Sequence, residues 1–165
     1  GNTSIINLIS FGEQEGKSFI ASYLQEYWED LGFTVKIISY DKDFNSQSMV
    51  YAQANSIFHI YEPPYGEENP DILIVKYPPL RDYPISTALL QEAQVNLLVA
   101  DACRVWTTSD TMLLEHFKKQ ITKHLWIWGF APSPHQRAFR AFTAPVWRIA
   151  LWKPSGKTLP FFENL

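Results

Sequence analysis

Apolar residues form short, dense runs in the first 130 positions of the chain, and the runs are separated by segments with helical spacing. Runs of this length are typical of strands that are buried on both faces of a parallel sheet. They predict strands at residues 5–9, 33–39, 71–75, 95–100 and 125–130. Because the runs alternate with amphipathic segments, the pattern predicts an α/β fold, a doubly wound and mostly parallel sheet between two layers of helices.

The helical segments are those in which apolar residues recur every three or four positions. The clearest runs over residues 16–31, and Gly32 is its predicted C-terminal stop. A second strong pattern covers residues 107–123, with Ser109 or Asp110 as the predicted N-cap. Weaker patterns predict shorter helices at residues 45–56, 86–94 and 135–142.

The chain length suits one domain, because 165 residues bury one sizeable core but are too few for two. Residues 1–130 are predicted to form this domain. Residues 131–165 are rich in proline and aromatic residues and are predicted to be an extension packed on it. Covering the edge of the sheet is the favoured role for this segment, and a contact surface for a partner is the alternative.

The first strand, helix and second strand lie within about 35 residues, which predicts a βαβ unit with parallel pairing and a right-handed crossover. The polar segment between the first strand and the helix ends in Gly16-Lys17-Ser18. This order is that of a phosphate-binding loop, in which Lys17 would reach the terminal phosphates and Ser18 would hold Mg²⁺. The match is incomplete, since Phe11 stands at the expected first glycine and Gly12 follows it. We therefore predict nucleotide binding at Gly12, Gly16, Lys17 and Ser18, with a plain turn before a helix as the alternative.

Composition and charge exclude several classes of function. The net charge of −3 gives no electrostatic case for nucleic acid binding, and Glu13 and Glu15 add negative charge to the predicted loop. The single cysteine, Cys103, excludes an internal disulfide, and the histidines lack the spacing of a metal site. No run approaches the roughly 20 apolar residues that span a bilayer. The chain starts with Gly1 rather than Met, so a membrane segment upstream stays open.

Three segments resemble, in order and spacing, the cytoplasmic domain of bacterial tyrosine kinases: EGKSFIASYLQEYWEDLGFTVKIISYD, DILIVKYPPL and VNLLVADACRVWTTSD. These kinases belong to the deviant phosphate-loop group of the MinD and ParA ATPases, and they form the C-terminus of membrane proteins that control exopolysaccharide and capsule chain length. The resemblance covers roughly residues 4–130. It implies ATP or ADP with Mg²⁺ as ligands, and membrane proteins of polysaccharide export or polymerisation as partners. It also implies the cytoplasmic face of the inner membrane, or the cytoplasm, as location, and leaves a homo-oligomer open.

The aligned motifs also show where the chain departs from this family. The second motif of the family is a strand ending in Asp-x-Asp, and the aligned positions here are Ser39 and Asp41. The third motif ends in Asp-Thr-Pro-Pro, whereas this chain has Lys-Tyr-Pro-Pro beginning at Lys76. Lys76 thus replaces an aspartate that organises Mg²⁺. A lysine about 5 Å from Mg²⁺ is repelled by roughly 6–7 kcal/mol at an effective dielectric constant of 20.

We therefore expect Ser39 and Lys76 to disable metal-assisted phosphoryl transfer. Lys76 is predicted to pair with Asp41 at the vacated cation site, and a lysine directed into solvent is the alternative. No tyrosine follows residue 83, so the C-terminal tyrosine cluster that these kinases phosphorylate is absent from this chain.

The leading prediction is a catalytically degenerate phosphate-loop domain that regulates or assembles polysaccharide biosynthesis and binds nucleotide weakly or not at all. The first alternative is an active ATPase or tyrosine autokinase, with Lys17 and Asp41 as catalytic residues, Ser18 and Asp41 as metal ligands, and Asp43 as a further carboxylate. The second alternative is a protein-interaction module. Partitioning of the MinD or ParA type is disfavoured, because Gly12 occupies the position of their signature lysine.

Overall fold

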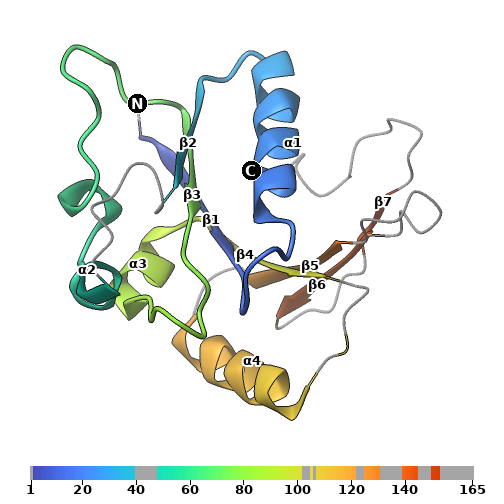
Figure 1. Ribbon diagram of the computed structural model, residues 1–165. Helices are drawn as coiled ribbons and strands as arrows, with labels where there is room; N and C mark the ends of the chain where they lie inside the picture. Colours follow the sequence, from blue (N-terminus) through green and yellow to red (C-terminus); the bar gives the residue numbers. More distant parts are fainter. Residues whose placement is uncertain are drawn as a thin grey trace.

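Figure 1 shows a computed structural model of the chain, which describes residues 2–39, 48–101, 105, 107–121, 125–130, 139–144 and 150–152. The elements in chain order are β1 (Ser4–Ile9), α1 (Lys17–Asp30), β2 (Val35–Ser39), α2 (Ser48–Gln53), the 3₁₀ helix η1 (Ile57–His59), β3 (Ile72–Lys76), α3 (Thr87–Glu92), β4 (Val95–Asp101), α4 (Thr108–Gln120), β5 (Leu125–Phe130), β6 (Phe139–Ala144) and β7 (Ala150–Trp152). None of the helices within these residues has both the length and the apolar character to cross a membrane.

One seven-stranded sheet runs through the molecule in the order β2-β3-β1-β4-β5-β6-β7. The first five strands in this order pair in parallel, and β6 and β7 continue the sheet in antiparallel pairs. The predicted doubly wound, mostly parallel sheet is confirmed, and each of the five predicted strands is present. Parallel pairing brings the carboxyl ends of β2, β3, β1 and β4 to the same edge, which is where open α/β sheets bind ligands.

Helices cover both faces of this sheet (Figure 1). Alternate residues of β1 point to opposite faces, as the period of a strand requires. Ile6 and Leu8 belong to the apolar core beneath α1, which also contains Leu24 and Trp28 of that helix. The opposite core holds β1 residues Ile5 and Ile9 together with Leu89 and Leu90 of α3 and Phe117 of α4. The chain therefore folds into three layers around β1.

The strands β1 and β2 are parallel as predicted, but they do not pair, because β3 lies between them. The register aligns Ile74 of β3 with Ile6 of β1 on one side and with Ile37 of β2 on the other. The four apolar residues of β3 are all buried, whereas three of the five residues of β2 are half-buried. The more apolar strand thus takes the interior place, and β2, with Lys36 in it, becomes the edge.

The helix α1 ends at a glycine in a left-handed conformation. Gly32 has a φ of 91°, and the N–H groups of Gly32 and Phe33 donate to the carbonyls of Glu29 and Trp28 at 2.9 and 3.0 Å. These two bonds form a Schellman motif, which confirms the predicted stop at Gly32. The predicted N-cap of the later helix is wrong.

The residue that caps α4 is Thr107, and Asp110 is the third residue of the helix. The Thr107 hydroxyl accepts from the Asp110 N–H at 3.3 Å, and the Asp110 carboxylate accepts from the Thr107 N–H at 2.8 Å. This reciprocal pair is a capping box, and its spacing of three residues is what the N-cap prediction overlooked.

The predicted short helix at residues 135–142 is also wrong, because Phe139–Ala144 forms strand β6. An isolated helix of eight residues is marginal in water. The edge of β5 offers this segment a ladder of backbone hydrogen bonds instead. Residues 131–138, 145–149 and 153–165 lie outside the described part of the chain, and so do Cys103, Asp41 and Asp43. The prediction that residues 131–165 pack on the domain as a unit stays a prediction.

Two buried amides tie β1 and β4 to α3. Asn7 and Asn96 are fully buried, and the Asn7 amide donates to Asn96 Oδ1 at 2.9 Å and to the Leu89 carbonyl at 3.2 Å. The Asn96 amide donates to the carbonyl of Leu90 at 2.8 Å. Because unpaired polar groups are costly in a core, this network favours one placement of α3 against the sheet.

We predict that Asn96→Ala lowers the free energy of unfolding by about 2 kcal/mol, because it leaves the Leu90 carbonyl and part of the Asn7 amide buried without partners. Chemical denaturation monitored by circular dichroism measures this loss. The matched control is Asn69→Ala in an exposed loop, which is expected to change stability by less than about 0.5 kcal/mol. Equal losses for the two variants would contradict the role assigned to the buried pair.

Candidate functional site

The connection from β1 to α1 turns sharply at its end. Gly16 precedes the helix with φ 103° and ψ 10°, a left-handed conformation that suits glycine, and Gln14 also has a positive φ of 54°. Gly16, the N-cap residue of α1, makes no side-chain hydrogen bond to the first turn. Helix N-termini that end a loop in this way present backbone N–H groups to anions. Lys17 and Ser18, the first two helical residues, lie beside these groups.

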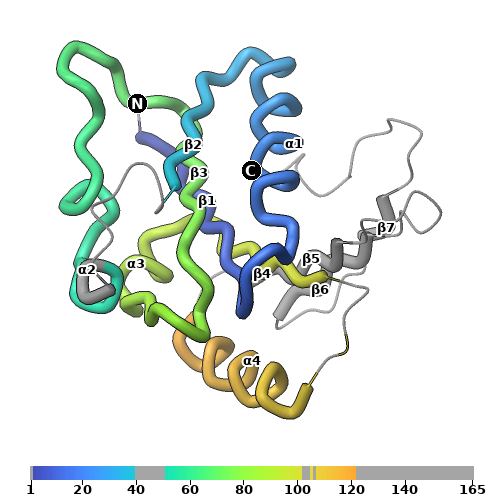
Figure 2. Tube along the Cα trace, in the orientation of Figure 1, coloured from blue at the N-terminus to red at the C-terminus, as the bar shows by residue number. Residues whose placement is uncertain are grey.

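The segment that follows β3 runs alongside this loop and fixes its course. The Tyr77 N–H donates to the Leu8 carbonyl at 3.1 Å, and the Leu80 N–H donates to the Ser10 carbonyl at 2.9 Å. A third bond joins the Arg81 N–H to the Phe11 carbonyl at 3.1 Å. The ladder between β1 and β3 therefore continues past both strands. The course of the two segments beyond the strand ends can be followed in Figure 2. The segment that begins at Lys76, which is the third motif, is thus held against the loop that ends in Gly16-Lys17-Ser18, which is the first motif.

Two lysine side chains cross between these segments in opposite directions. Lys17 Nζ donates to the carbonyl oxygen of Tyr77 at 2.6 Å, so the loop lysine is anchored on the end of β3. Lys76 Nζ donates to Ser18 Oγ at 2.8 Å, so the β3 lysine is anchored on the start of α1. The predicted partner Asp41 lies outside the described residues. The partner that the structure shows for the Lys76 ammonium group is the hydroxyl predicted to bind Mg²⁺.

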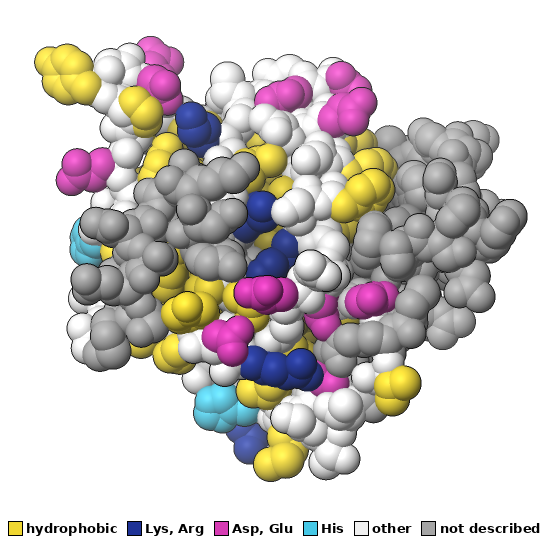
Figure 3. All heavy atoms as spheres, viewed as in Figure 1, with side chains coloured by type: hydrophobic (Ala, Val, Ile, Leu, Met, Phe, Trp, Pro, Cys, Tyr) yellow, Lys and Arg dark blue, Asp and Glu magenta, His cyan; other side chains and the backbone are white. Residues whose placement is uncertain are grey.

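The middle of the loop is enclosed by charged groups. Arg81 Nη1 and Glu15 Oε1 lie 3.5 and 3.8 Å from the position that a Cβ would take on Gly12. Glu15 is only 3% exposed, whereas Glu13 is exposed. On the face shown in Figure 3, Lys and Arg side chains lie close to Asp and Glu side chains in the middle of the molecule. A phosphate entering the loop would therefore meet charges of both signs.

Arg81 and Asp110 are site residues that the sequence analysis did not identify. The Arg81 guanidinium forms an ion pair with the fully buried carboxylate of Asp110, which also caps α4. Arg81 is thus bound to the loop through its backbone and to α4 through its side chain. The Thr-x-x-Asp spacing at residues 107–110 is the sequence signal for the capping carboxylate. Nothing in the sequence pattern pairs it with Arg81.

The described residues near Ser18 offer hydroxyl and ammonium groups, and the predicted ligand Asp41 lies outside the described part of the chain. Ser39 ends β2 opposite Lys76 in the register of the sheet, and it brings a hydroxyl where the family motif has a carboxylate. Mg²⁺ prefers carboxylate and phosphate oxygens, and it is repelled by an ammonium group. Within the described residues, no group of three or more His, Cys, Asp or Glu side chains could hold a metal ion. The described donor set therefore consists of hydroxyls beside a positive charge.

Tyr77, which follows Lys76, anchors this corner in the core. Its ring is fully buried and meets the ring of Tyr51 edge-on, with centroids 5.8 Å apart and an interplanar angle of 74°. Burial raises the pKa of the Tyr77 hydroxyl far above its usual value, and Glu92 and Tyr51 contribute in the same direction. The hydroxyl therefore stays neutral, and the side chain is inaccessible to a kinase.

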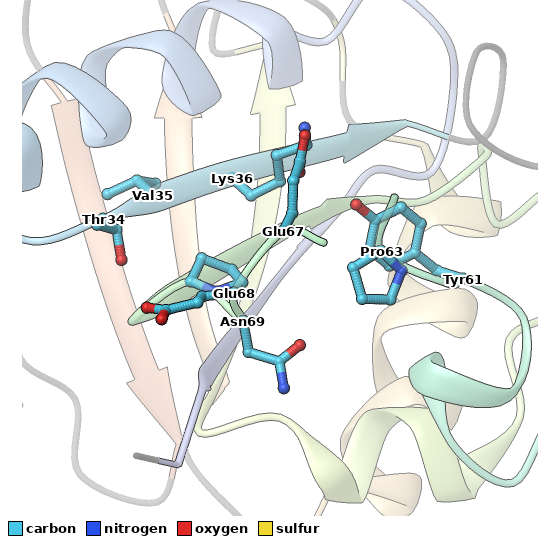
Figure 4. Close-up of a pocket in the computed structure, with 9 residues that line it drawn as sticks. Thr34, Val35, Lys36, Tyr61, Pro63, Glu67, Glu68 and Asn69 are labelled. Atoms are coloured by element: carbon cyan, nitrogen blue, oxygen red, sulfur yellow. The ribbon is translucent and has the colours of Figure 1, made fainter. Parts of the chain in front are cut away.

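A cavity of about 180 Å³ lies at a different place, along the edge strand β2 (Figure 4). Thr34, Val35 and Lys36 form one wall, and the loop from Tyr61 to Pro70 forms the other. Lys36 and Glu67 reach toward each other across it, with Nζ and Oε2 3.7 Å apart. This volume is below the roughly 300 Å³ typical of small-molecule sites, so the cavity does not compete with the loop as a nucleotide site.

Together, the sheet and the loop form a three-layer α/β domain that begins with a strand-loop-helix unit. A search of solved structures finds similarity to the kinase domain of the Escherichia coli tyrosine kinase ETK, with a TM-score of 0.51 and 14% sequence identity. The match covers 79% of this chain and 69% of the kinase chain. At this identity the similarity shows the fold alone. No family model matches the chain, and no curated protein matches it.

The structure places Gly12, Gly16, Lys17, Ser18, Ser39 and Lys76 at the carboxyl edge of the sheet. Their assignment to nucleotide or metal binding stays a prediction. The geometry adds Arg81 and Asp110, which lie outside the expected set.

We predict that Arg81→Ala lowers the free energy of unfolding by about 1–2 kcal/mol, because it leaves the buried Asp110 carboxylate without its cation. The Arg81 side chain is 40% exposed, and water therefore screens part of the loss. Urea denaturation measures the change, and Asp82→Ala, an exposed neighbour, is the control. The double variant Arg81→Ala, Asp110→Asn is expected to recover part of the loss. A loss of stability no greater than that of Asp82→Ala would refute the stabilising role of the ion pair between Arg81 and Asp110.

Proposed function

We propose that this chain is a catalytically inactive relative of the bacterial tyrosine kinase domains, with a regulatory or assembly role in exopolysaccharide or capsule biosynthesis. The observation that supports inactivity is the 2.8 Å hydrogen bond from Lys76 Nζ to Ser18 Oγ. The fold similarity to a tyrosine kinase domain supports the kinship.

The length of this hydrogen bond supports the loss of the metal site. A Mg²⁺ ion bound to Ser18 Oγ at about 2.1 Å would lie at most about 5 Å from the Lys76 ammonium group. The double positive charge of Mg²⁺ and the single positive charge of Lys76 repel each other at that distance by roughly 6–7 kcal/mol at an effective dielectric constant of 20. Phosphoryl transfer by phosphate-loop enzymes depends on such a metal ion to neutralise developing charge. The geometry therefore favours a domain that keeps the fold without the reaction.

The proposed role places the domain with the membrane proteins of polysaccharide export or polymerisation, at the cytoplasmic face of the inner membrane or in the cytoplasm. This part of the proposal rests on the motif resemblance of residues 4–130. In such a role the domain would act through its surface and its loop conformation.

We predict that the protein with ATP and Mg²⁺ releases no phosphate above a buffer blank, and that Lys17→Ala leaves this background unchanged. Phosphate release and transfer of label from γ-labelled ATP measure the two possible activities. Lys36→Ala, which alters a lysine on the edge strand β2, is the control for general effects of removing a lysine. Hydrolysis or self-labelling that Lys17→Ala abolishes would establish an active enzyme and overturn the proposal.

The polysaccharide role predicts that deletion of the gene changes polymer length or yield in the source organism. Because the proposed role needs no phosphoryl transfer, the Lys17→Ala gene should restore the normal polymer as well as the unmodified gene does. Gel separation of extracted polysaccharide measures the length distribution. An unchanged polymer after deletion would refute the assigned role.

A further inference from the structure

The ammonium group of Lys76 places a fixed positive charge beside the hydroxyl that holds Mg²⁺ in phosphate loops. We propose that this loop binds the diphosphate part of a nucleotide without a metal ion, with Lys76 in place of Mg²⁺ as the cation. This inference rests on the proposed function, since it assumes a phosphate-loop domain that has lost its metal-dependent reaction. It adds the class of ligand, a nucleotide diphosphate, and states that this ligand binds without Mg²⁺.

The first argument is the placement of the two lysines. Lys17 Nζ lies 2.6 Å from the Tyr77 carbonyl, and Lys76 Nζ lies 2.8 Å from Ser18 Oγ, so both ammonium groups lie between the end of β3 and the start of α1. An ammonium group has three N–H donors, and Ser18 takes one of those of Lys76. In a phosphate loop the diphosphate lies beside this same serine, with Mg²⁺ between them. A donor already anchored there can bind a phosphate oxygen directly.

The second argument is the local balance of charge. The guanidinium of Arg81 is paired with the buried carboxylate of Asp110. Among the described charged residues of the loop and the end of β3, Lys17 and Lys76 are then balanced in formal charge by Glu13, which is exposed, and Glu15, which is buried. Water screens the exposed Glu13 carboxylate, and the start of α1 adds the positive end of a helix dipole. The site is therefore suited to an anion of moderate charge.

The third argument concerns whether Mg²⁺ raises or lowers the affinity of the loop for the nucleotide. Binding of Mg²⁺ to a nucleotide removes two negative charges from it. A site that supplies carboxylates for the metal binds such a nucleotide more tightly. A site that supplies an ammonium group instead is attracted less strongly to the phosphates and is repelled by the metal. Magnesium is therefore expected to weaken binding here. The known phosphate-loop enzymes show the opposite dependence.

The experiment titrates the protein with ADP and with inorganic pyrophosphate by isothermal calorimetry, first with EDTA and then with excess Mg²⁺. We expect both ligands to bind in EDTA, and affinity to fall severalfold in Mg²⁺. Lys76→Gln is expected to weaken binding in EDTA about tenfold, because it removes a charged hydrogen-bond donor. Lys36→Gln removes the same charge from the edge strand β2 and is expected to change affinity less than twofold.

Lys76→Asp tests the sign directly, because it restores a carboxylate at the position of the lysine. Its binding of ADP is expected to become dependent on Mg²⁺, with tenfold or greater tightening on addition of the metal. Thermal melting of each variant establishes that it is folded. If Lys76→Asp does not fold, Ser18→Ala replaces it. That variant removes the anchor of Lys76 and is expected to weaken binding in EDTA severalfold.

The outcomes separate this inference from the proposed function. Absence of binding to either ligand in EDTA at millimolar concentration overturns the inference and leaves an inactive domain in place. Tighter binding of ADP in Mg²⁺ than in EDTA by the unmodified protein, without turnover, also overturns the inference alone. Turnover of ATP that depends on Mg²⁺ overturns both. Binding to both ligands that Mg²⁺ weakens, with reversal in Lys76→Asp, supports the inference.

Discussion

The pairing of β1 with β3 determines the rest of this structure. The register aligns Leu8 with Lys76, and the ladder continues beyond the strands through the bond from the Tyr77 N–H to the Leu8 carbonyl. As a result, the chain leaving β3 lies directly beside the loop that leads into α1. A long side chain at position 76 is therefore held within reach of Ser18. A change of one side chain at this place therefore acts on the chemistry of a loop 58 residues earlier in the chain.

Much of the fold follows from the sequence pattern, because burial on both faces produces apolar runs that few other structures produce. The order of strands was harder to predict. A βαβ unit indicates parallel strands, but it does not show whether a later strand enters between them, as β3 does here. The deciding difference is the burial of Ile72, Leu73 and Ile74 against the half-buried residues of β2. This difference is visible in the sequence only as Lys36 within an otherwise apolar run.

The candidate site likewise has features that the sequence could predict and features that it could not. The positions of Gly16, Lys17 and Ser18 could be predicted, because a glycine in a left-handed turn before a helix is a local feature. The partner of Lys76 could not, since it depends on where the start of α1 lies relative to the end of β3. The pairing of Arg81 with Asp110 joins segments 29 residues apart and has no sequence signal of its own. The sequence shows which charged groups need a partner, and only the fold shows which group that partner is.

The edge strand β2 has a consequence for how copies of this chain could associate. An exposed strand edge invites a second strand to add to it, and proteins commonly prevent this with lysines, prolines or a covering loop. Here Lys36 lies within the edge strand, and the proline-containing loop from Tyr61 to Pro70 rests against it, joined by the ion pair to Glu67 (Figure 4). Extension of the sheet from this side would require the loop to detach. Addition of a strand at β2 would thus also open the cavity that this loop lines.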